Sequence, residues 1–316
     1  MHIVYNGYLY ADGPPHAVRA LAHALGRAGG GLPVPHTDYQ VSFDESGVRV
    51  AYVPGGAAAV NVNGAGTKAD TPSGSGGVFS PLPDACIFWD KDTRLAFALE
   101  AAGVRLYNTA AAVAACDDKA LTHLRLAESS SHGVPALPTP ATLLAPATYD
   151  AHTHGAFARR AAGLGFPLVL KECFGSLGGQ VYLVRDEAEL KEKIAQVAPR
   201  PFLAQAFVAP GGEDLRLYMV GEECGAAMRR VNTQDFRANI AAGGTAHAYT
   251  PSAEELALAR ACMARLGLHF AGVDLFPGGL VCEVNASAQF EALEEVTGAD
   301  VARRIVDYVE ACERRR

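Results

Sequence analysis

The amino-acid sequence predicts an α+β body that follows a small N-terminal α/β domain. In the first 107 residues, strand and helix candidates alternate with short links, which favours parallel strands in an open sheet. From about residue 164 onward, several strand candidates adjoin one another, which favours antiparallel pairing. The length of 316 residues suits two domains of roughly 150 residues each.

The N-terminal domain is predicted to open with a strand at residues 2–9. An amphipathic helix follows at 15–28 and ends at the glycines 29–31. Residues 54–77 are rich in Gly, Ala and Ser, and we interpret them as a mobile loop around one short strand. No strand–glycine-loop–helix order is in register here, so a linker is favoured over a phosphate-binding loop.

A strand–helix–strand unit completes this domain. The apolar run 85–88 predicts a strand, and 104–107 predicts the next one. Asp90 or Asp92 suits the N-cap of the helix between them, which reaches about residue 102. Because a helix joins the two strands, we expect them to pair in parallel.

The rest of the chain mixes helices and strands. A helix capped by Asp117 or Asp118 is predicted to run to about Ser131. Pro251 stands at the favoured first turn of a helix that ends near Gly267, and two helices close the chain. The other predicted elements are strands at 166–172, 180–184, 202–208, 215–220 and 224–231, a glycine loop at 174–179, a helix at 187–197 and a hairpin of 272–276 with 280–285.

Composition and charge argue against several classes of protein. The formal net charge is −7, which disfavours a nucleic-acid-binding surface. No apolar run approaches the roughly 20 residues of a membrane helix, and the N-terminus lacks the basic and apolar parts of a secretory signal. Seven cysteines without a CxxC pair are typical of thiols in a reducing cytoplasm. We therefore expect a cytoplasmic protein with no nucleic-acid or membrane partner.

The strand register of the last predicted hairpin depends on the length of its turn. A two-residue turn at 278–279 would pair Pro277 with Leu280. Asp274 would then lie directly opposite Glu283. Two carboxylates this close repel each other unless a cation lies between them.

These carboxylates and an amide form a candidate metal site. Asn285 is two residues after Glu283, so both side chains share a face with Asp274. Mg²⁺ prefers such oxygen ligands and uses one or two carboxylates together with substrate phosphates. The alternative is a solvated strand face with incidental acids, which the apolar flanks 270–273 and 280–282 disfavour.

Lys171 ends a predicted strand and enters the glycine loop 174–179. A lysine charge beside unobstructed backbone N–H groups suits a phosphate. The loop is neither a P-loop nor a dinucleotide fingerprint, because no Gly-Lys-Ser/Thr follows and the loop leads to a strand. Taken alone, a plain hairpin is the competing interpretation.

Three arginines, Arg229, Arg230 and Arg237, cluster in an otherwise acidic chain. Such a cluster favours a local anionic ligand, since arginines neutralise charge on a transferring phosphoryl group. Surface salt bridging is the alternative for any one of them. Together with the lysine and the oxygen ligands, the arginines indicate a site for a metal-bound nucleotide.

The chain from about Asp117 to its end resembles the ATP-grasp superfamily, and within it the RimK-type ligases, which join a carboxylate to an amine. The first ~110 residues match only loosely, as a pre-ATP-grasp domain. The segments that carry the resemblance are Asp117-Asp118-Lys119, LVLKECFGSLGG, FLAQAFV, GGEDLRLYMVG, MRRVNTQDFRANIAAGG, FAGVDLF and LVCEVNASAQFEALEEVTGADVA.

The resemblance implies an α+β ATP-grasp fold, in which two α+β subdomains sandwich ATP, preceded by the small α/β domain. The implied boundaries are 1–116 for that first domain, 117–200 for a lid subdomain and 201–316 for the subdomain with the metal site. The glycine loop and the lid would close over ATP and exclude water.

The resemblance also implies roles for individual residues. Asp274, Glu283 and Asn285 would bind two Mg²⁺ ions, for which Mn²⁺ could substitute. Arg237 and Arg230 would act in catalysis. The implied ATP-binding residues are Lys119 and Lys171 at the phosphates, Gly175, Ser176 and Gly178 in the loop, Gln205, Ala206, Phe207 and Val208 as the adenine hinge, Asp214 at the ribose and Asn239 near the phosphates.

Three departures from the family pattern concern the substrates. Ala206 stands where the family hinge usually carries Glu. Residues 239–244 read Asn-Ile-Ala-Ala-Gly-Gly instead of Asn-Leu-His-Arg-Gly-Gly, and 287–289 read Ser-Ala-Gln instead of Ser-Pro-Gly. The phosphate-binding residues are unaffected, and the identity of both substrates stays open.

The predicted function is an ATP-dependent carboxylate–amine ligase that works through an acyl phosphate. It would add glutamate or another amino acid to a small-molecule or peptide acceptor, as a monomer or a homo-oligomer. The alternatives are a non-catalytic ATP-binding sensor or partner protein, which the intact metal set disfavours, and an ATP-grasp phosphotransferase without an amine acceptor.

Overall fold

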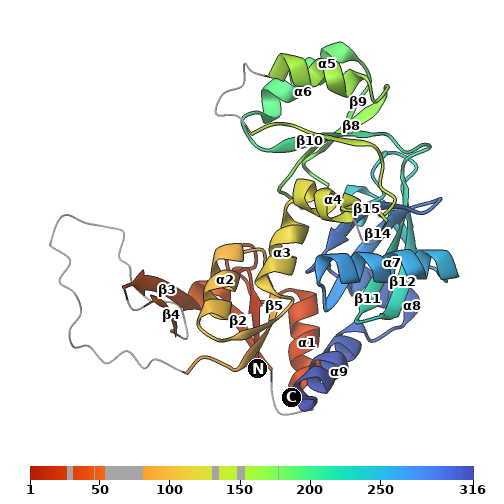
Figure 1. Ribbon diagram of the computed structural model, residues 1–316. Coiled ribbons are helices and arrows are strands. Elements are labelled where there is room, and N and C mark those ends of the chain that lie inside the picture. Colours follow the sequence, from red (N-terminus) through yellow and green to blue (C-terminus); the bar gives the residue numbers. More distant parts are fainter. Residues whose placement is uncertain (27–30, 46, 54–80, 130–134, 148–153, 177) are drawn as a thin grey trace. The chain divides into compact units, whose positions relative to one another are not determined.

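The computed structural model describes residues 1–26, 31–45, 47–53, 81–129, 135–147, 154–176 and 178–316. These residues form two compact units, Met1–Ala110 and Ala111–Arg316 (Figure 1). The predicted loop at 54–77 and the glycines 29 and 30 lie outside the described residues. The helix that was predicted to run to about Ser131 ends at Ala127.

The first unit contains a four-stranded parallel sheet in the order β2-β1-β5-β6, which confirms the predicted parallel pairing. The strand order reverses at β1, and right-handed crossovers then place the two helices on opposite faces of the sheet. Asp92 caps the second helix, where its side chain accepts a hydrogen bond from Leu95 N. The elements are β1 (His2–Tyr5), α1 (His16–Gly26), β2 (Leu32–Pro35), β5 (Ala85–Trp89), α2 (Thr93–Ala101) and β6 (Arg105–Tyr107).

Two features of this unit differ from the prediction. The strand predicted at 2–9 ends at Tyr5, because Asn6 Oδ1 accepts hydrogen bonds from the N–H groups of Tyr8 and Leu9 and turns the chain. The sequence analysis also missed an antiparallel hairpin and the short helix before it. These are η1 (His36–Asp38), β3 (Tyr39–Asp44) and β4 (Gly47–Tyr52).

The second unit begins with two helices and a part built on a four-stranded antiparallel sheet, β7-β10-β8-β9, which was predicted to be the lid and is called the lid below. The lid core lies between this sheet and α5 and α6, where Leu168, Leu170 and Phe202 are buried. The elements are α3 (Ala110–Asp117), α4 (Lys119–Ala127), β7 (Thr142–Leu144), α5 (Gly155–Ala162), β8 (Leu168–Glu172), β9 (Val181–Val184), α6 (Glu187–Val197) and β10 (Phe202–Ala206).

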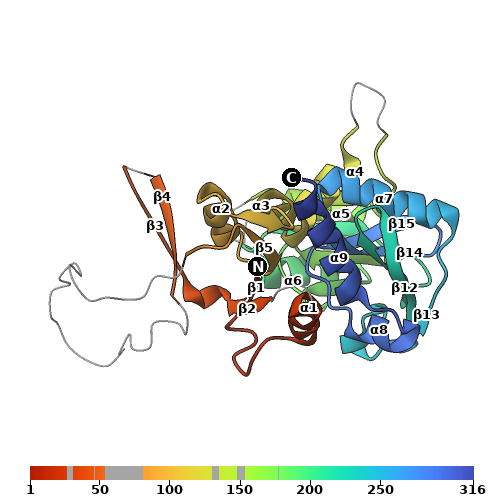
Figure 2. The same ribbon diagram turned by 90° about the horizontal axis from the view of Figure 1, so that it is seen from below.

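A five-stranded antiparallel sheet, β13-β12-β11-β14-β15, forms the rest of this unit. Helix α7 lies across one face of the sheet (Figures 1 and 2). Leu215, Leu217 and Met219 of β11 are buried on that face. Because side chains alternate along a strand, Asp214 and Arg216 point to the opposite face. The elements are β11 (Glu213–Val220), β12 (Glu223–Val231), η3 (Ile240–Ala242), β13 (Thr245–Ala248), α7 (Ala253–Leu266), β14 (Phe270–Phe276), β15 (Leu280–Asn285), α8 (Glu291–Thr297) and α9 (Val301–Arg314).

Several elements of this unit were not predicted or were placed differently. Elements α3, β7, α5 and β13 were missed, and the strand predicted at 202–208 ends at Ala206. Pro251 lies before the helix rather than in its first turn. Ser252 is the N-cap, and its hydroxyl and the Glu255 carboxylate each accept the other residue's backbone N–H.

The register of the β14–β15 hairpin corrects the predicted turn. Phe276, not Pro277, pairs with Leu280, so the loop has three residues, and Gly278 and Gly279 adopt φ of 93° and 82°. A bulge between Asp274 and Leu275 then shifts the register by one residue. The two differences cancel, and Asp274 lies opposite Glu283 as predicted.

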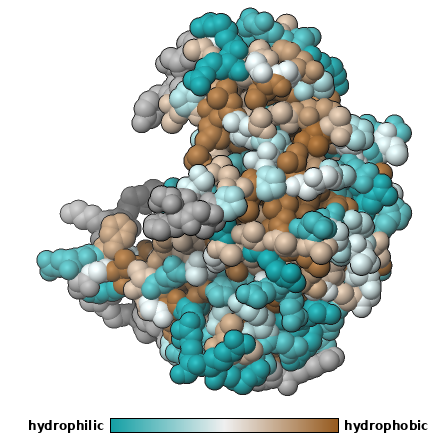
Figure 3. All heavy atoms as spheres, turned by 45° about the vertical axis from the view of Figure 1, so that its right-hand side comes forward, coloured by the Kyte–Doolittle hydropathy of each residue, from teal (hydrophilic) through white to brown (hydrophobic). Residues whose placement is uncertain are grey.

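The surface of the second unit is unevenly hydrophobic. Hydrophobic side chains gather where the lid meets the rest of the unit, whereas the outer end of the lid is mostly hydrophilic (Figure 3).

Among the residues that the structure describes, no helix is both long enough and apolar enough to cross a membrane.

Candidate active site

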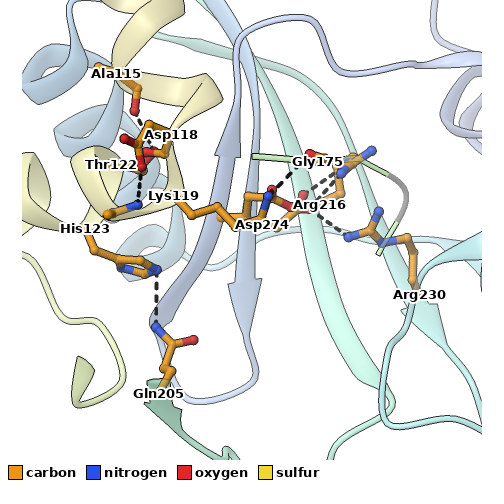
Figure 4. A network of polar contacts seen from close by, with 12 residues as sticks. Ala115, Asp118, Lys119, Thr122, His123, Gly175, Gln205, Arg216, Arg230 and Asp274 are labelled. Atoms are coloured by element: carbon orange, nitrogen blue, oxygen red, sulfur yellow. Dashed lines mark hydrogen bonds and ion pairs between the residues drawn. The ribbon is translucent and has the colours of Figure 1, made fainter. Parts of the chain in front are cut away.

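The face of the five-stranded sheet opposite its apolar core carries charged side chains that are largely buried. Asp274 lies directly opposite Glu283, and Asn285 lies opposite Gly272, so the three predicted metal ligands share one face. Arg216 Nε and Nη2 each donate a hydrogen bond of 2.7 Å to a different oxygen of Asp274 (Figure 4). Asp274 is only 2% exposed, so this paired carboxylate is part of the folded interior.

Arg230 adds a second buried cation to this face. Its guanidinium donates to both oxygens of Asp214 at 2.6 and 2.7 Å and to Asp274 Oδ2 at 2.8 Å. Burial alone would raise the pKa of Asp274, but Arg216 and Arg230 outweigh burial and hold that pKa below its usual value. The Asp274 carboxylate is therefore ionised at neutral pH.

Two buried lysines from different elements reach this face. Lys119, at the start of α4 behind the N-cap Asp118, donates to Gly175 O at 3.3 Å and lies 3.6 Å from Glu283 Oε1 (Figure 4). Lys171 on β8 is 7% exposed, and its ammonium makes no hydrogen bond or ion pair with any described residue. Its charge nevertheless helps to lower the pKa of Glu283, so Lys171 supplies positive charge beside the candidate metal ligands.

The glycine loop contacts the segment that follows β12. Arg237 Nη1 donates to Gly178 O at 2.7 Å, while Asp235 holds the rest of the guanidinium through bonds of 3.0 and 2.6 Å. Gly178 has φ of 75°, and a side chain there would meet Asn239 Oδ1 at 3.2 Å, so this contact requires glycine. Ser176 is exposed, and its carbonyl accepts from Gly179 N.

The family model described as the RimK-like ATP-grasp domain matches residues 116–309, which is more than half of the chain. The chain belongs to the RimK-like ATP-grasp family. The predicted resemblance and the predicted fold are thus confirmed.

Individual relatives of this RimK-like chain agree with the family. A probable alpha-L-glutamate ligase of Sodalis glossinidius is 40% identical over 46% of this chain and 52% of its own length. Beta-citrylglutamate synthase B of Danio rerio is 31% identical over 72% of this chain and 56% of its own length. The chain therefore spans about half the length of these curated relatives. The ATP-grasp ligase PsnB shares the fold of this chain, with a TM-score of 0.62 and 19% sequence identity. The match covers 98% of this chain and 97% of PsnB, whose structure was solved with a phosphomimetic variant of its minimal precursor, Mg and ADP.

The predicted hinge of the RimK-like domain, residues 205–208, covers the last two residues of β10 and the two residues after it. Gln205 is 2% exposed, and Ala206 N donates to Ala141 O at 2.9 Å. Phe207 and Val208 lie beyond the strand, half-buried, and their N–H groups make no backbone hydrogen bond within the described part of the chain. These two groups are available to a planar base.

A hydrogen-bond chain joins this hinge to the helix that carries Lys119. Gln205 Nε2 contacts Thr142 Oγ1 at 2.9 Å and His123 Nε2 at 3.2 Å. Figure 4 shows the contact with His123. The Thr142 hydroxyl donates to Pro140 O at 2.8 Å, so it accepts from Gln205. The second amide proton then points at His123 Nε2, which makes this histidine a neutral acceptor. Burial agrees with this assignment, since it lowers the pKa of His123 to about 4.

The donor set fits Mg²⁺ bound with a nucleotide. Asp274 Oδ1 accepts a single hydrogen bond and keeps a lone pair, and the side chain of Glu283 is 31% exposed with Lys119 as its ion-pair partner. Within the described ranges, no three His, Cys, Asp or Glu side chains gather as a metal cage. Mg²⁺ needs no such cage, because phosphate oxygens and waters complete its six ligands.

The structure brings most of the predicted site residues of the RimK-like domain together in two groups. The first is the charged face with Lys119 and Lys171, and the second is the loop with Arg237 and Asn239. The hydrogen bond from Lys119 Nζ to Gly175 O joins the loop to the charged face, whereas Arg237 bonds only to Asp235 and to Gly178 of the loop. Arg216 and Asp235 lie in the segments singled out from the sequence but were given no role of their own, and His123 was missed. Arg216 is two residues after Asp214 on a strand, and His123 is four after Lys119 on a helix.

Proposed function

We propose that this RimK-like chain is an ATP-dependent ligase that joins a carboxylate to an amine. The observation that carries the proposal is the meeting of the buried Lys119 and Lys171 with the ionised Asp274 and Glu283. Positive charge for phosphates and oxygen ligands for Mg²⁺ thus lie side by side. The names of the ligase and synthase relatives support the same activity.

The proposed reaction has two steps. A substrate carboxylate oxygen forms a bond to the γ-phosphorus of ATP, and the bond from that phosphorus to the ADP oxygen breaks. The amine nitrogen then attacks the carbonyl carbon of the acyl phosphate, the carbon–oxygen bond to phosphate breaks, and the nitrogen loses a proton. Mg²⁺ would neutralise phosphate charge when bound.

The chain's own residues would bind and orient the nucleotide. Lys171 supplies an unpaired positive charge to the phosphates, and Lys119 links the loop carbonyl of Gly175 to Glu283. We propose that Arg237 stabilises charge on the transferring phosphoryl group, with Arg230 keeping Asp274 ionised. We also propose Gly178 and Ser176 as part of a lid loop that excludes water.

The finer parts of the proposal concern the ligands. We propose two Mg²⁺ ions on Asp274, Glu283 and Asn285, with Mn²⁺ as a substitute, and Gln205 to Val208 as the adenine hinge. Asp214 would bind the ribose, and Asn239 would lie near the phosphates. An amino acid would supply the carboxylate or the amine, in a cytoplasm whose reducing conditions suit seven cysteines that form no disulfide.

The test is the release of ADP and phosphate from Mg-ATP with a panel of amino acids, singly and in pairs, with products weighed by mass spectrometry. We expect release that requires both an acid and an amine, and a product lighter than their sum by one water. A phosphorylated product formed without an amine would identify a phosphotransferase instead. Tight binding of Mg-ATP without release in any pair would favour a non-catalytic sensor.

A further inference from the structure

The lid sheet carries an amide side chain whose orientation the protein fixes. Gln205 on β10 pairs with Thr142 on β7 and with Val169 on β8, so these three side chains lie on one face of the sheet. The alternate residues of β10, such as Phe202 and Ala204, are buried on the other face, against α5 and α6. Gln205 therefore faces away from the lid core.

Helix α4 joins this face of the lid to the charged face of the five-stranded sheet. His123 Nε2 on α4 lies 3.2 Å from Gln205 Nε2 (Figure 4). Lys119, four residues earlier on the same helix, places its Nζ 3.6 Å from Glu283 Oε1. Residues four apart lie on the same side of a helix. One side of α4 thus contacts both Gln205 and a predicted metal ligand, which puts the amide beside the proposed nucleotide site.

Both protons of the Gln205 amide are used by the protein. The Thr142 hydroxyl donates its own proton to Pro140 O at 2.8 Å, so it accepts from Gln205 Nε2 at 2.9 Å. The other amide proton points at His123 Nε2. The oxygen, Oε1, accepts no hydrogen bond from a described residue and is not fully enclosed. The side chain therefore offers a ligand an acceptor and no donor.

The neighbouring hinge residues offer the opposite kind of group. The N–H groups of Phe207 and Val208 make no backbone hydrogen bond within the described part of the chain, and Ala206 has no polar side-chain atom. Oε1 of Gln205 is thus the side-chain acceptor of this hinge. Adenine carries an amino donor at C6, whereas a 6-oxopurine such as guanine carries an oxygen acceptor there.

We infer that Thr142 and His123 are positioning residues that hold the oxygen of the Gln205 amide toward the base, so that the site selects a 6-aminopurine over a 6-oxopurine. The inference rests on the proposed function, because it takes the hinge as the place where the nucleotide binds. A 6-oxopurine would set its oxygen against Gln205 Oε1, and two acceptors without a proton between them cost free energy in a buried place.

A glutamine without these partners could avoid that cost. It would turn its amide over and donate a proton to the 6-oxo group instead. In this chain the turned amide would set Oε1 against Thr142 Oγ1, whose proton is held by Pro140 O, and against the lone pair of His123 Nε2. The two partners therefore act on base selection through the orientation of Gln205.

The deciding measurement compares ADP with inosine diphosphate, which has an oxygen in place of the 6-amino group. Calorimetry with the full chain and Mg²⁺ gives both dissociation constants without turnover. We expect the wild type to bind ADP more tightly, by about tenfold or more. Gln205→Met removes the acceptor and keeps the length of the side chain, so the two affinities should agree within about threefold. The exposed Gln196→Met on α6 is the matched control and should keep the wild-type ratio.

The positioning role is tested with Thr142→Val and His123→Leu, which remove different partners of the same amide. Each variant frees the amide to turn, so inosine diphosphate should bind about three- to tenfold more tightly than it binds the wild type. Loss of structure alone would weaken the binding of both nucleotides together and leave their ratio unchanged. Thr142→Ser keeps the hydroxyl and should restore the wild-type ratio.

The possible outcomes separate this inference from the ligase proposal. Equal binding of both nucleotides by the wild type, or an unchanged preference in Gln205→Met, would overturn the inference and leave nucleotide binding intact. If Thr142→Val and His123→Leu both keep the wild-type ratio, the two residues do not position the amide and the inference is wrong. If the wild type binds neither nucleotide, the proposed ligase function fails as well. A ratio that falls in both variants and returns in Thr142→Ser supports the inference even where no ligase activity is found.

Discussion

The two sheets of the second unit present contrasting electrostatic surfaces. On the five-stranded sheet, Asp274 and Asp214 are matched by Arg216 and Arg230 through hydrogen bonds of 2.6–2.8 Å. On the lid sheet, Lys171 is 7% exposed and makes no direct hydrogen bond or ion pair with a described residue, although its charge acts on Glu283. The two sheets therefore differ in whether their charged side chains are held by direct ion pairs.

This contrast identifies what the ligand must supply. The two arginines hold the pKa of Asp274 below its usual value, whereas burial raises the pKa of Asp214. Lys171 has no direct ion pair that an incoming anion would have to break. In the proposed ligase, the paired sheet would therefore hold the metal ion and Lys171 would contact a phosphate.

The largest effect should come from Glu283→Gln on the paired sheet. The substitution keeps the shape of the side chain but removes one negative charge that a metal would need. We expect kcat to fall by about 10³-fold or more while ATP still binds. Turnover and ATP affinity are measured separately, with the exposed Glu295→Gln as the control. Turnover within a few-fold of the wild type would refute the metal assignment.

A second variant tests the group that contacts the glycine loop. Arg237→Ala removes a guanidinium that Asp235 orients and that donates to Gly178 O. We expect kcat to fall about 10²-fold, because an arginine at a transferring phosphoryl group acts in the transition state. Arg160→Ala on the exposed side of α5 is the matched control. An effect confined to KM would reassign Arg237 to ground-state binding.

A third variant, Lys171→Met, tests the difference between the two sheets. We expect the KM for ATP to rise by about 10- to 100-fold, since the phosphates lose their unpaired cation. The same variant should leave the free energy of unfolding without nucleotide within about 1 kcal/mol of the wild-type value, because Lys171 makes no direct ion pair that would be lost. Chemical denaturation and steady-state kinetics measure the two quantities. A variant that loses stability as well as affinity would mean that Lys171 is a structural residue.

The sequence predicted the site best where the signal is local. Strand alternation put Glu283 and Asn285 on one face, and the Asp118 cap fixed the start of the helix that carries Lys119. Alternation needs only the period of two along one strand. The position of Asp274 opposite Glu283 was right for a different reason, since the longer loop and the bulge offset each other.

Contacts between distant segments could not be predicted in the same way. The pairing of Arg216 with Asp274 depends on β11 lying next to β14, which no local pattern specifies. Strands β7 and β13 are three and four residues long and lie at sheet edges, where neighbouring strands rather than their own residues decide their conformation. The contact of His36 with Asp90 likewise requires two strand ends that are far apart in the chain to meet.

The last prediction concerns the pH dependence of stability at the hinge rather than catalysis. Burial lowers the pKa of His123 to about 4, below its value of about 6.5 in an unfolded chain, so the unfolded state binds the extra proton first. The contribution of neutral His123 is complete above pH 6.5 and is lost as the pH falls toward 4. The loss amounts to about 3 kcal/mol if the group stays buried. His123→Gln should remove this part of the acid sensitivity, whereas the exposed His247→Gln should retain it.

Unfolding curves at pH 4.5 and pH 7.5 measure the difference. An equal loss of stability in the wild type and in His123→Gln would show that His123 is already protonated in the folded protein, and that the hydrogen-bond chain from Thr142 through Gln205 does not fix its neutral form.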